Sequence, residues 1–218
     1  MIKAIIFDFD GLIFDSELFI FTAFEDLYKK YELTLHKEKW NQSIGGALAF
    51  DPYEDILTKY PNIQKEELQK QYEEKYTFYS KGQLPREGVL NYLERAKELD
   101  LHIGLASSSP LAWIEEHLNK LQIKHYFDFI CTSDDVEQVK PDLELYQRVL
   151  DYFKLAPDEA IVFEDSPNGA LAAITAGIPC VIVPNQVTKS LSFDQRVLLR
   201  MDSKTDLTLD QVIEKADK

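Results

Sequence analysis

The feature that most restricts the fold is a series of short apolar runs separated by amphipathic segments long enough to form helices. The runs fall at Ala4–Phe9, His102–Ala106, Phe129–Cys131, Ala160–Phe163 and Cys180–Val183, and the amphipathic segments at Gly88–Leu99, Pro110–Leu121, Pro141–Phe153 and Pro167–Ala176. A continuous apolar run predicts a strand that is buried on both faces. Strands that alternate with helices predict a parallel sheet, because each helix returns the chain for the next strand. We therefore expect an α/β fold with a Rossmann-like parallel sheet.

Prolines mark the expected starts of three of these helices. Pro110, Pro141 and Pro167 stand where the first helical residue is expected, because proline lacks the N–H that would be unpaired there and its fixed φ suits a helix. Gly177, followed by Pro179, predicts the end of the last of the three helices.

Residues 16–82 interrupt this alternation, since they contain no convincing strand. Four segments look helical instead: Leu18–Tyr31, Lys37–Ile44, Pro52–Tyr60 and Lys65–Tyr79. Their aromatic side chains recur at helical spacing, which is typical of the core of a small helical bundle. We therefore expect a helical cap domain over residues 16–82, inserted into a core domain formed by residues 1–15 and 83–218.

The net charge and the lack of long apolar runs exclude several classes of protein. The 218 residues carry 38 acidic and 24 basic side chains, a formal net charge of −14. Nucleic acids and anionic membranes attract clustered Lys and Arg, so we expect neither as a partner. No apolar run approaches 18 residues, no signal peptide is evident, and Cys131 and Cys180 lie in apolar runs typical of buried free thiols. We therefore expect a cytoplasmic protein.

Two aspartates follow the first predicted strand at its C-terminal end, where open parallel sheets bind ligands. Asp8 and Asp10 are two residues apart and so begin on the same face of the chain. Two neighbouring carboxylates repel each other unless a cation lies between them or one is protonated. Gly11 then permits a sharp turn that frees backbone N–H groups to face the same place. Taken alone, the triplet is equally typical of an ordinary turn or capping aspartate.

Hydroxyl groups and a lysine come at the ends of two further predicted strands. Ser107, Ser108 and Ser109 precede a helix, so a hydroxyl there can donate to an anion near the positive end of the helix dipole. For Ser108 and Ser109 alone, helix capping is the stronger interpretation. Lys140 precedes Pro141, which holds it extended and directs it toward the end of the sheet. An exposed, solvated side chain is the simpler interpretation of that lysine alone.

Glu164 and Asp165 complete the set at the end of the fourth predicted strand. Carboxylates from two strand ends that meet at one edge supply the oxygen ligands that Mg²⁺ requires. Together the four positions provide a nucleophile, an acid/base, a hydroxyl, a fixed cation and metal-binding carboxylates, which is a complete set for phosphoryl transfer. The four histidines have no matching partners and are expected to be surface or core residues.

These motifs, in this order, resemble those of the haloacid dehalogenase superfamily of phosphatases. The matching segments are Phe7–Glu17, Ala106–Ser108, Lys140–Pro141 and Phe163–Ser166. The helical insertion after the first motif is similar to the cap of the branch that contains beta-phosphoglucomutase and many small-molecule phosphatases. The resemblance covers nearly the whole chain, and it implies a capped enzyme that is a monomer by default.

The resemblance also implies a role for each residue. Asp8 would attack phosphorus and form an aspartyl-phosphate, and Asp10 would protonate the leaving oxygen and then activate water. Ser107, with Ser108 beside it, and Lys140 would hold the phosphoryl oxygens. The substrate would be a small phosphate ester, such as a sugar phosphate.

The cofactor that the resemblance implies is Mg²⁺. Its expected ligands are the carboxylates of Asp8 and Asp165 and the backbone carbonyl of Asp10, with Glu164 in or near the coordination sphere. The negative charge of the chain makes such a cation necessary, because a phosphate ester would otherwise be repelled.

Several alternatives remain open. Haloacid dehalogenases use a lone aspartate as the nucleophile and no metal. This chain has a second aspartate, Asp10, together with Glu164 and Asp165, which favours a phosphatase or phosphomutase. Beta-phosphoglucomutases carry a His one turn into the first cap helix, where this chain has Ile20. They also carry basic residues around a specificity loop of the cap, and the corresponding segment of this chain, Ile44–Phe50, contains no basic residue. Hydrolysis is therefore preferred to mutase activity. A non-catalytic protein that binds Mg²⁺ and phosphate is the alternative of another class.

Overall fold

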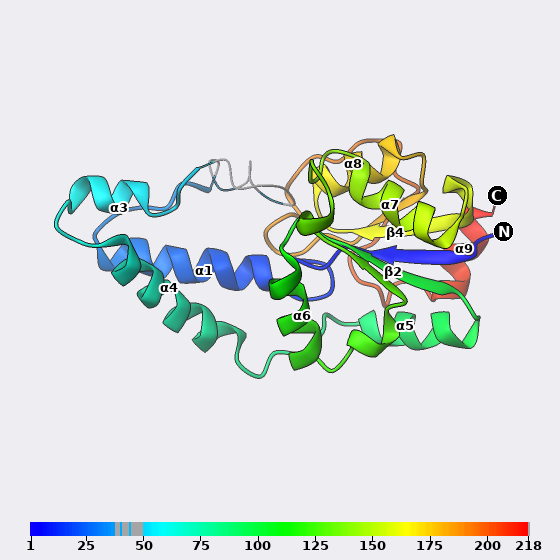
Figure 1. The fold of residues 1–218 in the computed structure, drawn as a ribbon, viewed down its shortest axis with the longest axis horizontal. Coiled ribbons are helices and arrows are strands. Elements are labelled where there is room, and N and C mark those ends of the chain that lie inside the picture. Colours follow the sequence, from blue (N-terminus) through cyan, green and yellow to red (C-terminus); the bar gives the residue numbers. More distant parts are fainter. Residues whose placement is uncertain (38–39, 41–43, 45–49, 218) are drawn as a thin grey trace.

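Six parallel strands form one sheet in the order β3-β2-β1-β4-β5-β6, with β1 near its centre (Figure 1). The computed structural model describes residues 1–37, 40, 44 and 50–217. The strands are β1 (Ala4–Phe7), β2 (His102–Ala106), β3 (Phe129–Cys131), β4 (Ala160–Glu164), β5 (Cys180–Ile182) and β6 (Leu199–Arg200). The five expected strands are present and the predicted α/β fold class is confirmed. The sixth, β6, has two residues, too few to leave an apolar run in the sequence.

The first strand ends at Phe7, two residues earlier than predicted, because a turn begins at once. The N–H of Asp8 still donates to Phe163 of β4 at 3.0 Å, but the carbonyl of Phe9 accepts from Leu12, Ile13 and Phe14. Asp8 therefore stands at the end of a central strand, and Asp10 lies in the turn.

Helices cover both faces of the sheet. Alternate residues of β1 point to opposite sides, so Ile5 and Phe7 pack in one apolar cluster while Ala4 and Ile6 pack in another. The first cluster includes residues of α5 (Val89–Glu98), α6 (Leu111–Lys120) and α9 (Leu209–Ala216), and the second includes residues of α7 (Glu144–Phe153) and α8 (Pro167–Thr175). Three short 3₁₀ helices, η1 (Lys124–Tyr126), η2 (Ser133–Asp135) and η3 (Pro157–Glu159), lie in the connections.

Only one of the three prolines opens its helix. Pro167 is the first residue of α8, as predicted, but Pro110 is the extended N-cap of α6. Pro141 precedes α7 by three residues, because the carboxylate of Asp142 accepts the N–H of Glu144 at 2.9 Å and forms a turn before the helix. The prediction that Pro110 and Pro141 are first helical residues is therefore wrong.

Between β1 and α5 the chain forms a separate group of helices, at the left of Figure 1. These are α1 (Ser16–Lys30), α3 (Glu54–Lys59) and α4 (Lys65–Ser80), which we call the helical unit. Its own apolar cluster includes Phe24, Leu27, Tyr28, Trp40, Tyr53, Ile56 and Leu68. Most of the predicted helix Lys37–Ile44 and of the loop Ile44–Phe50 falls outside the described residues. No described helix is both long enough and apolar enough to cross a membrane.

Candidate active site

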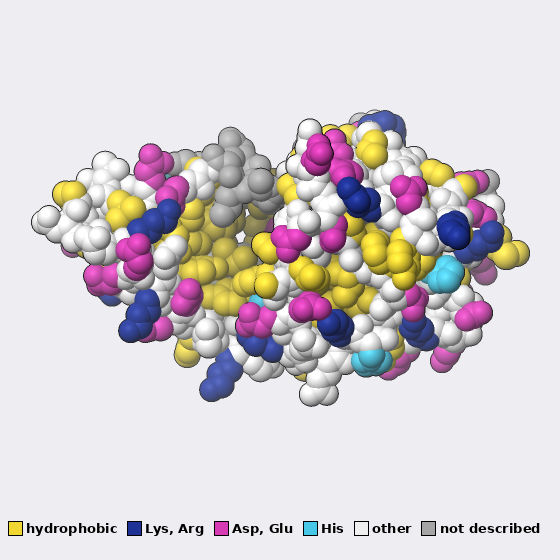
Figure 2. Space-filling model, viewed as in Figure 1, with side chains coloured by type: hydrophobic (Ala, Val, Ile, Leu, Met, Phe, Trp, Pro, Cys, Tyr) yellow, Lys and Arg dark blue, Asp and Glu magenta, His cyan; other side chains and the backbone are white. Residues whose placement is uncertain are grey.

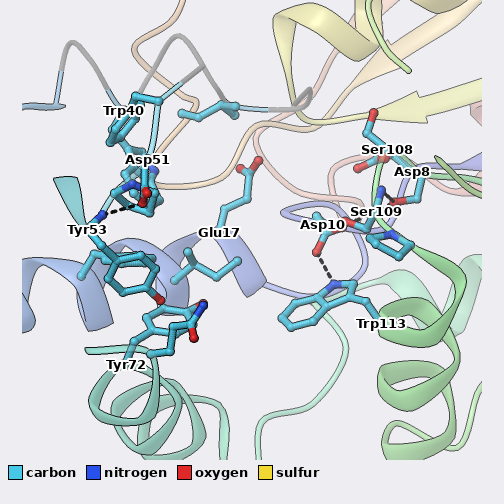
Figure 3. A pocket seen from close by; sticks show the side chains of 18 of the residues that line it. Asp8, Asp10, Glu17, Trp40, Asp51, Tyr53, Tyr72, Ser108, Ser109 and Trp113 are labelled. Carbon is cyan, nitrogen blue, oxygen red and sulfur yellow. Dashed lines mark hydrogen bonds between the residues drawn. The ribbon is translucent and has the colours of Figure 1, made fainter. Parts of the chain in front are cut away.

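A cavity of about 800 Å³ lies between the helical unit and the C-terminal edge of the sheet. Figure 2 shows it as a hollow with apolar walls between the two parts of the molecule. Asp8, Asp10, Ser107, Ser108, Ser109 and Trp113 line it from the sheet side, and Ile20, Phe24, Trp40, Tyr53, Lys65, Gln69 and Tyr72 from the helical unit. Figure 3 shows these two groups facing each other, with Glu17 between them. The cavity therefore places the residues of the first two motifs against an aromatic wall.

Asp8 and Lys140 form a buried ion pair at the sheet end of this cavity. Their side chains are 6% and 2% exposed, and the Lys140 Nζ lies 2.5 Å from Asp8 Oδ1. The same ammonium donates to the carbonyl of Ala106 at 2.8 Å and to Glu164 Oε1 at 2.7 Å. Its three protons thus have three acceptors, so Lys140 is fixed in place and is not the solvated lysine of the simpler interpretation.

Glu164 is held on every side by protein donors. Its Oε1 also accepts from the Tyr146 hydroxyl at 2.6 Å, and its Oε2 accepts from the N–H groups of Asp165 and Ser166 at 3.1 and 3.3 Å. The carboxylate lies against α8, where a Cβ on Gly169 would stand 1.8 Å from Oε1. Only glycine fits there, and Glu164 acts as a fixed anion beside Lys140.

Asp165 carries the one buried side-chain oxygen in the described chain for which no hydrogen-bond partner is found. Its Oδ2 accepts from Asn185 Nδ2 at 2.7 Å, whereas Oδ1 accepts from nothing. Ligand oxygens of Asp8, Glu164 and Asp165 lie within 4.8 Å of one another. A buried anionic oxygen without a donor is strongly disfavoured unless a cation faces it. The residues at this position therefore fit a hard cation with oxygen ligands, such as Mg²⁺.

The charges in this cluster do not balance without such a cation. Burial raises the pKa of Asp8 to about 8, because the neighbouring Glu164 and Asp10 offset much of the attraction of Lys140. Burial, with Glu17 and Asp8 nearby, raises the pKa of Asp165 well above its usual range. Burial alone would lower the pKa of Lys140, but Asp8 and Glu164 hold it above its usual value. The lysine is therefore cationic, and the remaining negative charge needs a proton or a metal ion.

Asp10 does not join this cluster through its carboxylate. Its Oδ1 accepts from Ser16 Oγ at 2.7 Å and from Trp113 Nε1 at 3.0 Å, and its Oδ2 from Ser109 Oγ at 2.6 Å and Ser107 Oγ at 3.4 Å. Ser109 therefore does not cap α6, in contrast to the capping interpretation. Asp10 and Ser107 both line the cavity beside Asp8.

The turn after Asp10 is held from beneath by donors on distant segments. Gly11 has φ +79°, and a Cβ there would lie 2.3 Å from Asp165 Oδ2, so both the backbone angle and the space require glycine. Its carbonyl accepts from Arg86 and, at 3.3 Å, from Asn185, and the buried Lys204 Nζ donates to the next carbonyl, that of Leu12, at 2.9 Å. These bonds fix the turn that connects the two aspartates to the helical unit.

The structure thus brings all of the expected residues to one edge of the sheet: Asp8, Asp10, Ser107, Ser108, Lys140, Glu164 and Asp165. The sequence reasoning missed Asn185, although it follows β5 and obeys the same strand-end rule as the others. Tyr146 and Trp113 lie inside amphipathic helices, where no sequence signal separates them from core residues. His117 is a buried residue of α6, as expected of a core histidine.

Comparison with known proteins agrees with this geometry. The sequence profile of the haloacid dehalogenase-like hydrolases matches residues 5–183. The candidate phosphatase YhcW of Bacillus subtilis (strain 168) is 41% identical over 195 residues, which are 89% of each chain. A phosphorylated carbohydrates phosphatase of Thermotoga maritima is 33% identical over 182 residues, 81% of this chain and 82% of that one.

A solved structure of a relative has a similar fold. The crystal structure of beta-phosphoglucomutase from Clostridium difficile superimposes with a TM-score of 0.75 at 26% identity, and the match covers 100% of this chain and 98% of that one. The fold, the motifs and the sequence similarity therefore coincide over almost the entire length. The chain belongs to the haloacid dehalogenase-like hydrolase family, and within that family it is a phosphatase.

Proposed function

We propose that this protein is a Mg²⁺-dependent phosphatase that hydrolyses a small phosphate ester through an aspartyl-phosphate on Asp8. The observation that carries the proposal is the pairing of Asp8, which lines the cavity, with the buried Lys140 behind it, close to the unpartnered Oδ1 of Asp165. A nucleophile, a fixed cation and a cation-binding oxygen lie together where a phosphate ester can enter. The helical unit, within residues 16–82, would act as a cap that shields this site from water.

The residues divide the reaction between them. Asp8 would attack phosphorus, while Lys140 keeps the Asp8 carboxylate oriented and attracts the phosphoryl oxygens. The hydroxyl of Ser107, with Ser108 beside it, would donate to those oxygens. Asp10 would give a proton to the leaving oxygen and take one from the water that releases phosphate.

Mg²⁺ would be held by the carboxylates of Asp8 and Asp165 and the backbone carbonyl of Asp10. Because both oxygens of Glu164 already accept from the protein, we assign Glu164 the role of an anion next to the metal that orients Lys140. When bound, Mg²⁺ would neutralise the carboxylates and the charge on the phosphoryl oxygens.

A phosphomutase is the second candidate, because relatives named beta-phosphoglucomutase share the fold. Such an enzyme must hold two phosphate groups at once. Lys65 is the only Lys or Arg among the described residues of the cavity wall, and it is already paired with Asp51 at 2.5 Å. Ile20, at the position where the mutases carry a His, lines the same cavity and cannot exchange a proton. Both observations favour hydrolysis.

The test is a screen of phosphate esters with Mg²⁺, in which the Asp8→Asn protein is the blank. We expect phosphate release that chelation abolishes and that the blank lacks. Turnover close to wild type in Asp8→Asn would remove the nucleophile assignment. Conversion of glucose 1-phosphate to glucose 6-phosphate with a bisphosphate activator would establish the mutase instead. Binding of Mg²⁺ and phosphate without any turnover would indicate the non-catalytic alternative.

A further inference from the structure

The carboxylate of Asp10 has an asymmetric set of hydrogen-bond donors. Its Oδ2 faces two hydroxyls, those of Ser109 and Ser107, which can accept as well as donate. Its Oδ1 accepts from the hydroxyl of Ser16 and from the indole N–H of Trp113, and an indole N–H can only donate. Figure 3 shows the bond from Trp113 to Asp10. Because the indole N–H and the Ser16 hydroxyl both donate to Oδ1, Oδ1 is held as an acceptor, and Oδ2 faces the hydroxyls that can exchange a proton with it. A proton carried by Asp10 therefore lies on Oδ2, the oxygen that faces Ser107.

Trp113 is itself held by a second residue of α6. The centre of the His117 ring lies 4.1 Å from that of the Trp113 ring, and His117 Nδ1 lies 2.8 Å from the Trp113 carbonyl oxygen. A carbonyl only accepts, so Nδ1 carries the ring proton of the neutral imidazole. His117 Nε2 is then an acceptor, and it receives the hydroxyl proton of Tyr76 at 2.8 Å.

Tyr76 belongs to α4 of the helical unit, not to the sheet domain. Its side chain is buried, and its ring centre lies 5.4 Å from that of Trp113. A continuous path of contacts thus runs from the helical unit through Tyr76, His117 and Trp113 to Asp10. The plane of the indole, and with it the direction of its N–H, depends on where α4 stands.

We propose that Trp113 is a positioning residue for the acid/base Asp10 and that Tyr76 fixes Trp113 through His117. Trp113 keeps Oδ1 as an acceptor, so that Oδ2 delivers the proton. As the bond from phosphorus to the leaving oxygen breaks and that to Asp8 forms, the Oδ2 proton moves to the leaving oxygen. Oδ2 later takes a proton from the water that attacks the phosphorus. This inference rests on the proposed function, because it assigns a part in that reaction.

The experiment compares two esters whose leaving groups differ in their need for a proton. p-Nitrophenolate leaves phosphorus without taking up a proton. The alkoxide of an alkyl phosphate, chosen from the active esters of the screen, must be protonated as it leaves. We expect Trp113→Phe, which keeps an aromatic ring but removes the N–H, to lower kcat/KM for the alkyl ester by about tenfold or more. The value for p-nitrophenyl phosphate should fall by a smaller factor, because that step needs no general acid, so the ratio of the two values is the readout.

Tyr76→Phe is a second variant, on a different helix. We expect it to lower kcat/KM for the alkyl ester more than that for p-nitrophenyl phosphate, but by a smaller factor than Trp113→Phe does. Tyr79→Phe is its matched control, because Tyr79 lies on the same helix and its hydroxyl donates to Asp26 at 2.6 Å. Equal losses on both esters, or no loss on either, would overturn the inference. Failure of the proposed function would be seen separately, as an inactive wild type or an active Asp8→Asn protein.

A measurement without substrate completes the test. The chain has two tryptophans, Trp40 and Trp113, so the protein gives two indole N–H signals by NMR, and Trp113→Phe identifies the second. We expect that signal to move in Asp10→Ala and in Tyr76→Phe and to stay in Tyr79→Phe. A Trp113 signal that is indifferent to Asp10→Ala would also overturn the inference.

Discussion

Replacing Asp165 by Asn should stabilise the metal-free protein, although the residue is placed in the metal site. The change removes one negative charge, and the amide oxygen can still accept from Asn185. Ligand oxygens of Asp8 and Glu164 lie within 4.8 Å. At that separation two unit charges repel each other by about 3.5 kcal/mol at an effective dielectric constant of about 20. Proton uptake relieves part of this, so we expect a net gain of about 2–4 kcal/mol at pH 8.

The gain should depend on pH in a defined direction. Because the pKa of Asp165 is raised on folding, its contribution to stability is fully present below about pH 4 and is lost as the pH rises toward the folded-state pKa. In EDTA, the melting temperature of Asp165→Asn should therefore exceed that of wild type by about 5–15 °C at pH 8. The difference should shrink toward pH 4.

Calorimetry in EDTA and in Mg²⁺ measures both effects. Mg²⁺ should raise the melting temperature of the wild type and leave that of Asp165→Asn nearly unchanged. Asp158→Asn, at an exposed position, is the control for the loss of one negative charge. Equal melting temperatures of wild type and Asp165→Asn in EDTA at pH 8, or a variant that still gains stability from Mg²⁺, would refute this reasoning.

Three further predictions follow from the same contacts. Lys140→Met leaves two buried carboxylates unpaired and should lower the free energy of unfolding by about 3–5 kcal/mol, which an unchanged urea midpoint would contradict. Gly169→Ala places a Cβ 1.8 Å from Glu164 Oε1 and should lower both stability and phosphatase activity, so a variant with wild-type activity would exclude the close packing. Asp10→Asn should lower kcat about 10²–10⁴-fold while KM changes little, and steady-state kinetics with Mg²⁺ would show any smaller effect.

The sheet and the strand-end residues could be predicted because both depend on local sequence. Apolar runs bounded by aspartates, serine or Lys-Pro mark where each strand ends, and parallel strands bring those ends to one edge. Asp8, Lys140 and Glu164 come from three separate segments and still meet within hydrogen-bond distance. The alternation of apolar runs and amphipathic segments was sufficient to predict the sheet and the residues at its C-terminal edge.

The contacts that tune the site could not be predicted, since they depend on side chains that face each other only after packing. Trp113 and Tyr146 look like ordinary core residues of amphipathic helices until the fold aims them at Asp10 and Glu164. Asn185 contacts Asp165 across 20 residues and carries no motif. The composition of the cavity likewise depends on how α1 and α4 stand over the sheet.

The central claim is that Asp8 becomes phosphorylated during turnover, and trapping that intermediate tests it most directly. The enzyme is mixed with Mg²⁺ and substrate, quenched in acid within one turnover and digested with trypsin, which cuts after Lys3 and Lys29. Borohydride added before digestion reduces the acyl phosphate and releases phosphate, so we predict a homoserine in place of Asp8 in the peptide from Ala4 to Lys29. A phosphoryl group on another residue, or an enzyme that turns over without any, would contradict the account.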